Sequence, residues 1–254
     1  MAKTAIVTGA SQGIGVALVE ALLGAGFTVH AVARDEARMA ERWRQAMTDG
    51  TLVPHGLDVT DRTAVERFFA ETFGEADAPL DLLFNNAGTS NSLGAVWESD
   101  PAIWWSDLTT NVLGLYLMTH AALGVMRRQN HGVIVNMDGG RPKGMSAYAA
   151  SKAAVVQFTK ILDEELRHEN SAIAVYAANP GLVKTRLTQA QADSDVAAHW
   201  NPGVREAFAK GATRRPEEVA QKLVKLLPKM GPETSGQYFD PTTPDGEFKP
   251  MPGE

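Results

Sequence analysis

Thr8-Gly9-Ala10-Ser11-Gln12-Gly13-Ile14-Gly15 directly follows the first apolar run of the chain, residues 4–8, and opens a helical pattern over residues 14–23. In a strand-to-helix turn, Gly9 allows a tight bend, Gly13 lets the backbone approach a pyrophosphate, and Gly15 lets helix and strand pack closely. The helix N-terminus adds N–H groups and a partial positive charge. The turn therefore predicts a dinucleotide site whose phosphate-binding residues are Gly9, Ser11, Gln12, Gly13, Ile14 and Gly15.

Short apolar runs alternate with longer helical patterns along the rest of the chain. Strands are expected at residues 4–8, 28–33, 52–55, 80–85, 133–137, 172–178 and 236–239, and helices at about 14–23, 36–47, 103–129, 147–167 and 216–227. This alternation is typical of βαβ units. We predict a single α/β domain over residues 1–254, a Rossmann-type doubly wound parallel seven-stranded sheet with helices on both faces. Pro54 cannot donate to a central ladder, so the third strand is expected at a sheet edge.

The composition excludes several function classes. The 254 residues are 44% hydrophobic, enough for one large core, and the net charge of −6 argues against binding to nucleic acid or anionic membranes. The chain has no cysteine for a disulfide or thiolate, and its six histidines lack metal-ligand spacing, so no metal is expected. The first apolar run is too short for a signal or membrane segment. We expect a soluble cytoplasmic protein whose partner is a small molecule.

The end of the second strand predicts which dinucleotide binds. A carboxylate there would bond a ribose 2′-hydroxyl and repel a 2′-phosphate, but this chain has Ala33 followed by Arg34. NADP is therefore favoured over NAD. The alternative is that Arg34 is a solvated loop cation beside Asp35.

Tyr148 and Lys152 form a candidate reactive pair. Residues four apart share one face of a helix. A free tyrosine has a pKa of about 10, and a nearby ammonium stabilises its anion. The pair can therefore serve as a general acid or base.

Six short motifs together resemble those of the short-chain dehydrogenase/reductase family in order and approximate spacing. They are Thr8-Gly9-x-x-x-Gly13-x-Gly15, Asp58-Val59, Asn85-Asn86-Ala87-Gly88, Asn111, Tyr148-Ala-Ala-Ser151-Lys152 and Pro180-Gly181-x-Val183-x-Thr185. The motifs span residues 4–185, and the expected strands extend the similarity to about residue 240.

The resemblance implies a cofactor role for several of these positions. Asp58 and Val59 would contact the adenine ring. The turn from Asn85 to Gly88, with Ala87, would shape the wall beside the adenosine ribose and stabilise the central sheet. The residues implied to hold the nicotinamide ring and its carboxamide are Pro180, Gly181, Val183 and Thr185.

The same resemblance implies three catalytic residues. Asn111, at an expected helix kink, would hold a water in a proton relay to Lys152. Lys152 would bond the nicotinamide ribose and lower the pKa of Tyr148, the proton donor in reduction. Without the family pattern, Asn85 and Asn111 are equally well interpreted as capping or turn amides.

The sequence departs from the family pattern where the fifth strand ends. The family usually has a Ser-Ser pair there, and its second serine bonds the substrate carbonyl. Here Asp138 and Gly139 take these positions, with Gly139 only nine residues before Tyr148. Removing one preorganised donor to a developing oxyanion costs about 2.7 to 4 kcal/mol. The absent hydroxyl therefore indicates either a changed mechanism or a lost one.

Three substitutes for the serine are open: Ser146 reaching back, backbone N–H groups of Gly139 or Gly140, and a protonated Asp138. Ser146 also suits a helix cap. An ionised Asp138 would instead orient an amine or hydroxyl of the substrate or pair with Arg141.

Two further segments bear on substrate and assembly. Residues 186–213 are expected to form a long substrate lid, with Trp200 either lining an apolar pocket together with Trp97 and Trp104 or simply packing. Residues 241–254 are expected to form an extended tail that either docks on a neighbouring subunit or is mobile. A homodimer or homotetramer is implied by the family, with the helices near 103–129 and 147–167 as interfaces.

The expected function is an NADP-dependent oxidoreductase that moves hydride between nicotinamide and a carbonyl or alcohol carbon, with Tyr148 handling the proton. Two alternatives stay open. One is an NADP-binding protein with altered or no redox turnover, acting in regulation or structure. The other is a non-redox biosynthetic enzyme that uses the same site.

Overall fold

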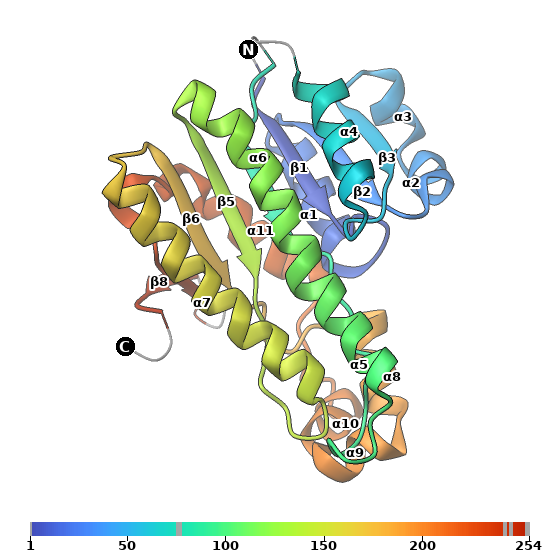
Figure 1. The fold of residues 1–254 in the computed structure, drawn as a ribbon. Coiled ribbons are helices and arrows are strands. Elements are labelled where there is room, and N and C mark those ends of the chain that lie inside the picture. The colour runs from blue at the N-terminus through green and yellow to red at the C-terminus, as the bar shows by residue number, and fades with distance from the viewer. Residues whose placement is uncertain (1, 75–77, 241–242, 244–245, 252–254) are drawn as a thin grey trace.

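The computed structural model describes residues 2–74, 78–240, 243 and 246–251, and a single twisted sheet lies at its centre (Figure 1). The strand order is β3-β2-β1-β4-β5-β6-β7-β8. The strands are β1 (Thr4–Thr8), β2 (Thr28–Ala33), β3 (Leu52–Gly56), β4 (Leu82–Asn85), β5 (Gly132–Met137), β6 (Ile173–Ala178), β7 (Tyr238–Asp240) and β8 (Glu247–Lys249). The prediction that the strand containing Pro54 lies at an edge is confirmed.

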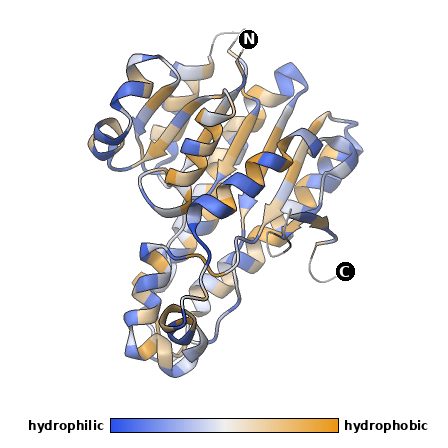
Figure 2. Ribbon diagram, turned by 180° about the vertical axis from the view of Figure 1, so that it is seen from behind, coloured by the Kyte–Doolittle hydropathy of each residue, from blue (hydrophilic) through white to orange (hydrophobic). Residues whose placement is uncertain are grey.

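Helices cover both faces of the sheet, as predicted for a doubly wound fold. They are α1 (Gly13–Gly24), α2 (Glu36–Arg42), α3 (Arg44–Thr48), α4 (Arg62–Phe73), α5 (Pro101–Leu108), α6 (Leu115–Gln129), α7 (Ser146–His168), α8 (Arg186–Asp193), α9 (Asp195–Trp200), α10 (Pro202–Ala209) and α11 (Pro216–Leu226). One core forms where α1, α2 and α11 pack on the sheet, and the other where α4, α6 and α7 do. Figure 2 shows hydrophobic residues concentrated along the strands between these layers.

The sheet has one strand more than the seven predicted. Residues 247–249 of the tail pair antiparallel with β7, while β1 to β7 form the expected parallel set. The Phe248 ring lies 5.2 Å from that of Tyr176 and 6.5 Å from that of Phe239, measured between centroids. Part of the tail therefore docks on its own sheet edge. The rest of the extended tail predicted over residues 241–254 lies largely outside the described residues.

Several predicted helices differ in detail. The helix expected over residues 36–47 is broken at Trp43, whose side chain is buried in the core between α2 and α3. The helix expected over 103–129 begins at Pro101 and passes through a π-helical turn, Thr109–Gly114, at the position where the kink at Asn111 was expected. Helix α4 was not predicted, although its buried residues repeat at helical spacing.

The continuous helical stretch Pro101–Gln129 is long and apolar enough to cross a membrane by length and composition alone. In this protein it is a partly buried core helix, because Met118, Ala122 and Val125 pack into the core against the sheet.

The segment predicted as a long lid loop contains three short helices instead. Helices α8, α9 and α10 occupy residues 186–209 and gather with α5 at one end of the molecule (Figure 1). The capping box of Thr185 and Thr188 starts α8. The chain winds outward from β1 on one side and from β4 on the other, so the reversal point, where ligands bind in such sheets, lies between them.

Candidate active site

A cavity of about 730 Å³ begins at the turn after β1 and continues to α8. It brings together most of the residues expected to bind cofactor or substrate. These are Gly9, Ser11, Gln12, Gly13, Ile14, Arg34, Asp58, Val59, Ala87, Gly88, Asp138, Gly139, Tyr148, Lys152, Pro180, Gly181, Val183 and Thr185. The expected residues that do not line it are Gly15, Asn85, Asn111, Ser146 and Trp200.

The turn after β1 has the form of a phosphate cradle. Gly9 and Gly13 have φ of +66° and +56°, and a Cβ on Gly13 would lie 3.2 Å from the Thr185 methyl carbon. A Cβ on Gly15 would collide with the Gly9 carbonyl oxygen, so Gly15 serves the close packing of α1 on β1. The Gln12 side chain does not cap α1, and its first turn has no acidic residue. The open N–H groups and bare backbone fit a dinucleotide pyrophosphate.

A second arginine, Arg38, lines the cavity beside Arg34. It lies on α2, whose first turn is fixed by a hydrogen bond of 3.0 Å from the Arg38 N–H to the Asp35 carboxylate. Sequence reasoning missed Arg38, although a cation five residues after the end of β2 was the available signal. Two cations that follow β2 closely in the sequence therefore line the cavity.

Asn85 serves the fold and not the cavity. Its amide donates to Thr119 Oγ1 at 2.8 Å and to Asn136 Oδ1 at 2.9 Å, and Asn136 donates in turn to Thr159 Oγ1 at 3.0 Å. This buried chain joins β4 and β5 to α6 and α7. The expectation that this turn stabilises the central sheet is confirmed for Asn85. Its assignment as a cofactor-binding residue is corrected, since its neighbours Asn86 to Gly88 line the cavity instead.

Asn111 holds the loop after β4. Its side-chain oxygen accepts from the Thr89 N–H at 2.7 Å, and its amide donates to Thr89 O and to Ser151 Oγ, both at 2.9 Å. Since this buried side chain is occupied by the loop and by α7, a relay water would need the main chain of the π-helical turn. The predicted relay stays a prediction.

Tyr148 and Lys152 both line the cavity, with the Lys152 ammonium 5.6 Å from the centroid of the Tyr148 ring, but their electrostatics differ from the expectation. Burial, followed by the charge of Asp138, raises the pKa of Tyr148 to about 12. Burial also lowers the pKa of Lys152 to about 8, and its ammonium donates to Met137 O at 2.7 Å. The expected lowering of the Tyr148 pKa by Lys152 is therefore not found in this arrangement, because desolvation dominates. A neutral tyrosine at neutral pH suits proton donation.

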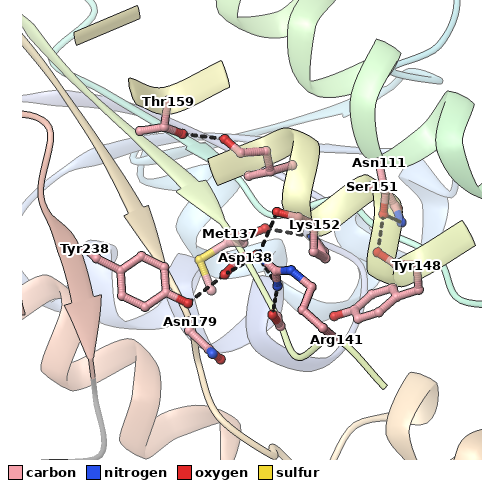
Figure 3. Close-up of polar contacts among 12 residues, drawn as sticks. Asn111, Met137, Asp138, Arg141, Tyr148, Ser151, Lys152, Thr159, Asn179 and Tyr238 are labelled. Atoms are coloured by element: carbon pink, nitrogen blue, oxygen red, sulfur yellow. Dashed lines mark hydrogen bonds and ion pairs between the residues drawn. The ribbon is translucent and has the colours of Figure 1, made fainter. Parts of the chain in front are cut away.

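The end of β5 carries a network that the sequence indicated only in part. Asp138 is 3% exposed; it accepts from Tyr238 Oη at 2.6 Å and pairs with Arg141 at 2.9 Å. Figure 3 shows Arg141 reaching toward Asp138 beside Tyr148. The expectation that Asp138 pairs with Arg141 is confirmed, whereas Tyr238 was missed because it comes from a distant strand.

Ser146 and Trp200, expected near the substrate, lie outside the cavity. The Ser146 hydroxyl accepts from Trp104 Nε1 at 3.0 Å, and it makes no cap bond because Ser146 is already the first helical residue. The Trp200 ring meets that of Trp97 edge-on, with 6.2 Å between centroids. Its Cβ lies so close to Gly144 that a side chain there would collide with it. Both residues are used in packing.

Comparison with known proteins identifies the family. The family model described as short chain dehydrogenase matches residues 3–195. A 3-oxoacyl-[acyl-carrier-protein] reductase of rhamnolipid biosynthesis from Pseudomonas aeruginosa is 31% identical over 249 residues, covering 93% of each chain. An acetoacetyl-CoA reductase from Paracoccus denitrificans is 34% identical over 233 residues, covering 89% of this chain and 90% of the relative.

Solved structures agree with this. The closed form of a serine dehydrogenase complexed with NADP+ superposes with a TM-score of 0.75 at 28% identity, covering 87% of each chain. A short-chain dehydrogenase/reductase from Burkholderia phymatum in complex with NAD gives 0.77 at 25%, covering 90% of this chain and 86% of that one. With the cradle, the tyrosine and the lysine in one cavity, these matches establish that the chain belongs to the short-chain dehydrogenase/reductase family, NAD(P)-dependent oxidoreductases of carbonyl and alcohol substrates.

Proposed function

We propose that this protein is an NADP-dependent reductase of a small carbonyl compound, with Tyr148 as proton donor and without the serine hydroxyl usual in its family. One observation carries the proposal: a single cavity runs from Arg34 and Arg38, past the Gly9–Ile14 cradle, to Tyr148 and Lys152. Asp35 also lines this end of the cavity, where its carboxylate accepts from the Arg38 N–H, but the residue directly after Ala33 is Arg34, and the two cations favour the 2′-phosphate of NADP.

Different residues of the cavity would bind the cofactor and transfer the proton. The cradle and the α1 N-terminus would hold the pyrophosphate, and Arg34 with Arg38 the 2′-phosphate. Bound NADPH would supply the hydride. Tyr148, neutral because burial raises its pKa to about 12, would protonate the oxygen of the reduced carbonyl. Lys152, with a pKa of about 8, is still mainly protonated at neutral pH. Its positive charge would stabilise the phenolate that Tyr148 becomes when its proton is transferred.

The substrate class proposed is the 3-oxoacyl thioester, on the names of the two relatives above. Polar and apolar residues of the lid segment also line the cavity, among them Thr188, Gln191, Asn201 and Val204. The soluble, cytoplasmic setting predicted from the sequence fits such a substrate and stays a proposal.

Fluorescence and absorbance separate this proposal from its alternatives. NADPH and NADH are titrated by quenching of tryptophan fluorescence, and NADPH oxidation is followed with acetoacetyl-CoA, then with ketones, aldehydes and quinones. We expect tighter binding of NADPH and turnover of at least one carbonyl. NADPH binding without oxidation of any carbonyl would favour the non-redox alternatives.

Tyr148→Phe tests the proton donor. We expect it to bind NADPH normally and to lose about a hundredfold or more in kcat, the range for general acid catalysis. Tyr116→Phe is the matched control, because Tyr116 is 46% exposed on α6, outside the cavity. Undiminished turnover by Tyr148→Phe would contradict the proposed role of Tyr148 as proton donor.

A homodimer or homotetramer built through α6 and α7 is also proposed. These two helices run side by side across one face of the molecule (Figure 1). Leu113 and Tyr116 before and on α6, and Ile161 on α7, are 42%, 46% and 43% exposed. Apolar side chains this exposed on adjacent helices favour a second copy as cover.

A further inference from the structure

We propose that Arg141, held by Asp138, replaces the usual serine indirectly, by fixing the Gly139–Gly140 peptide so that the Gly140 N–H donates to the substrate carbonyl oxygen. This inference rests on the proposed carbonyl reduction. It makes Gly140 a catalytic residue through its backbone and Arg141 a positioning residue.

The first step is the position of the peptide. Gly139 is buried and lies against the tyrosine: a Cβ on Gly139 would collide with Tyr148 Oη and lie 3.0 Å from Tyr148 Cζ. Gly140, the next residue, is exposed and lines the cavity. The Gly139–Gly140 peptide therefore borders the place where the proton donor must meet the carbonyl oxygen.

The second step is the direction of the peptide. The Gly139 carbonyl accepts a hydrogen bond from the Arg141 guanidinium. The described chain contains no cis peptide bond, and in a trans peptide the N–H points opposite to the C=O. The Gly140 N–H thus points away from Arg141. In the described part of the chain, no protein acceptor is found for this N–H or for that of Gly139.

The third step is the role of Arg141 itself. Four acceptor oxygens surround its two terminal nitrogens: Gly139 O, Lys152 O at 2.9 Å, and the two Asp138 oxygens at 2.9 and 3.2 Å. Asp138 is in turn fixed by Tyr238. Since these nitrogens are occupied, Arg141 orients the peptide and the first turns of α7 instead of binding the carbonyl oxygen (Figure 3).

The chemistry is that of an oxyanion donor. As hydride reaches the carbonyl carbon, negative charge grows on the oxygen until Tyr148 delivers its proton there. A preorganised N–H beside Tyr148 Oη would stabilise that charge, and one such donor is worth about a hundred- to a thousandfold in kcat.

Two substitutions of Gly140 test the donor. Gly140→Pro removes the N–H, whereas Gly140→Ala keeps it, and a Cβ there would meet only Pro142 Cδ, at 3.9 Å. We expect Gly140→Pro to fall below Gly140→Ala by about a hundredfold in kcat, with similar NADPH affinity. Equal kcat of the two variants, both binding NADPH, would overturn the donor.

Arg141→Ala tests the positioning. We expect a loss of about tenfold or more in kcat with little change in KM, and partial recovery on adding guanidinium ion, which a loss of general stability would not show. The control is Arg128→Ala, because Arg128 also donates to two backbone carbonyls, of Gly124 and Phe73, but lies outside the cavity. Equal losses in both variants would overturn the positioning role.

A readout without turnover keeps this inference separate from the proposed function. Protein labelled with 15N-glycine is examined by NMR with NADP+ and then with acetoacetyl-CoA added, and the Gly140 signal is assigned by its absence in Gly140→Ala. We expect a downfield shift of the Gly140 amide proton, and this shift would support the donor even if no carbonyl is reduced. An unmoved Gly140 signal at saturating acetoacetyl-CoA would overturn the inference, whether or not turnover occurs.

Discussion

Gly139 lies so close to Tyr148 that a Cβ atom on the glycine would occupy the space of the tyrosine hydroxyl. At Gly139 the backbone itself therefore lies against the tyrosine. The position has no room for a side chain unless Tyr148 moves.

Gly139→Ser should consequently fail to improve turnover. We expect a decrease of about tenfold or more in kcat/KM and a loss of about 1–3 kcal/mol in the free energy of unfolding, because an inserted side chain must displace Tyr148. Urea unfolding and steady-state kinetics measure both. Gly24→Ser is the control, since no atom lies within 4 Å of a Cβ at Gly24. Higher activity of Gly139→Ser than wild type would contradict the steric argument.

The lowered pKa of Lys152 predicts a pH dependence of stability. The folded protein holds the Lys152 proton less tightly than the unfolded chain, since burial lowers its pKa from 10.5 to about 8. The buried Lys152 charge thus lowers the free energy of unfolding below about pH 8, and this loss disappears as the pH rises from about 8 to 10.5. The unfolding free energy of wild type, relative to Lys152→Met, should rise by up to about 1.4 kcal/mol per pH unit in that window. Urea melts from about pH 7 to 10 measure this, and a flat difference would refute it.

Arg34 and Arg38 should set the preference for the 2′-phosphate. We expect Arg34→Ala and Arg38→Ala each to weaken NADPH binding by about tenfold, equivalent to about 1.4 kcal/mol, with little effect on NADH. Fluorescence titration measures both constants. Arg42→Ala on the same helix is the control, because Arg42 pairs with Glu20 and lies outside the cavity. Equal losses for NADPH and NADH would show that neither arginine recognises the phosphate.

Asn85 should matter for stability and not for cofactor affinity. Asn85→Ala deprives buried Thr119 and Asn136 of their partner, which costs about 1–3 kcal/mol in the free energy of unfolding. The dissociation constant of NADPH should stay within about twofold, because Asn85 does not line the cavity. A tenfold change in that constant would correspond to about 1.4 kcal/mol of binding free energy. Gln45→Ala, which removes only an exposed bond to Asp49, is the control for stability. Weaker NADPH binding without lost stability would restore the cofactor role.

Ile161→Glu should dissociate the proposed oligomer. A charge on the apolar surface of α6 and α7 would be buried unpaired in an interface. Light scattering coupled to size exclusion measures the mass. Met47→Glu is the control, since Met47 is similarly exposed, at 37%, but lies on α3. A wild-type protein that runs as a monomer would contradict the proposal directly.

Local sequence patterns predicted most of the fold, because the period of the apolar side chains and the available backbone donors specify most of its strands and helices. The alternation of strands and helices and the edge position of the Pro54 strand follow from side-chain period and backbone donors. The break at Trp43 was not visible, because it depends on where a large ring finds space in the core. The eighth strand was missed since a three-residue strand carries almost no periodic signal.

The sequence by itself determined the family, the phosphate cradle and the Tyr148–Lys152 pair, because short motifs in a fixed order specify the backbone turns that phosphate binding requires. Only the tertiary structure decided what each polar side chain does. Asn85 and Ser146 bond to partners 51 and 42 residues away in the chain, respectively, and Asp138 meets Tyr238 from a strand 100 residues on. Contacts of this kind arise from packing between layers, which no local pattern records. For the same reason, only the fold shows that Gly139 stands against Tyr148.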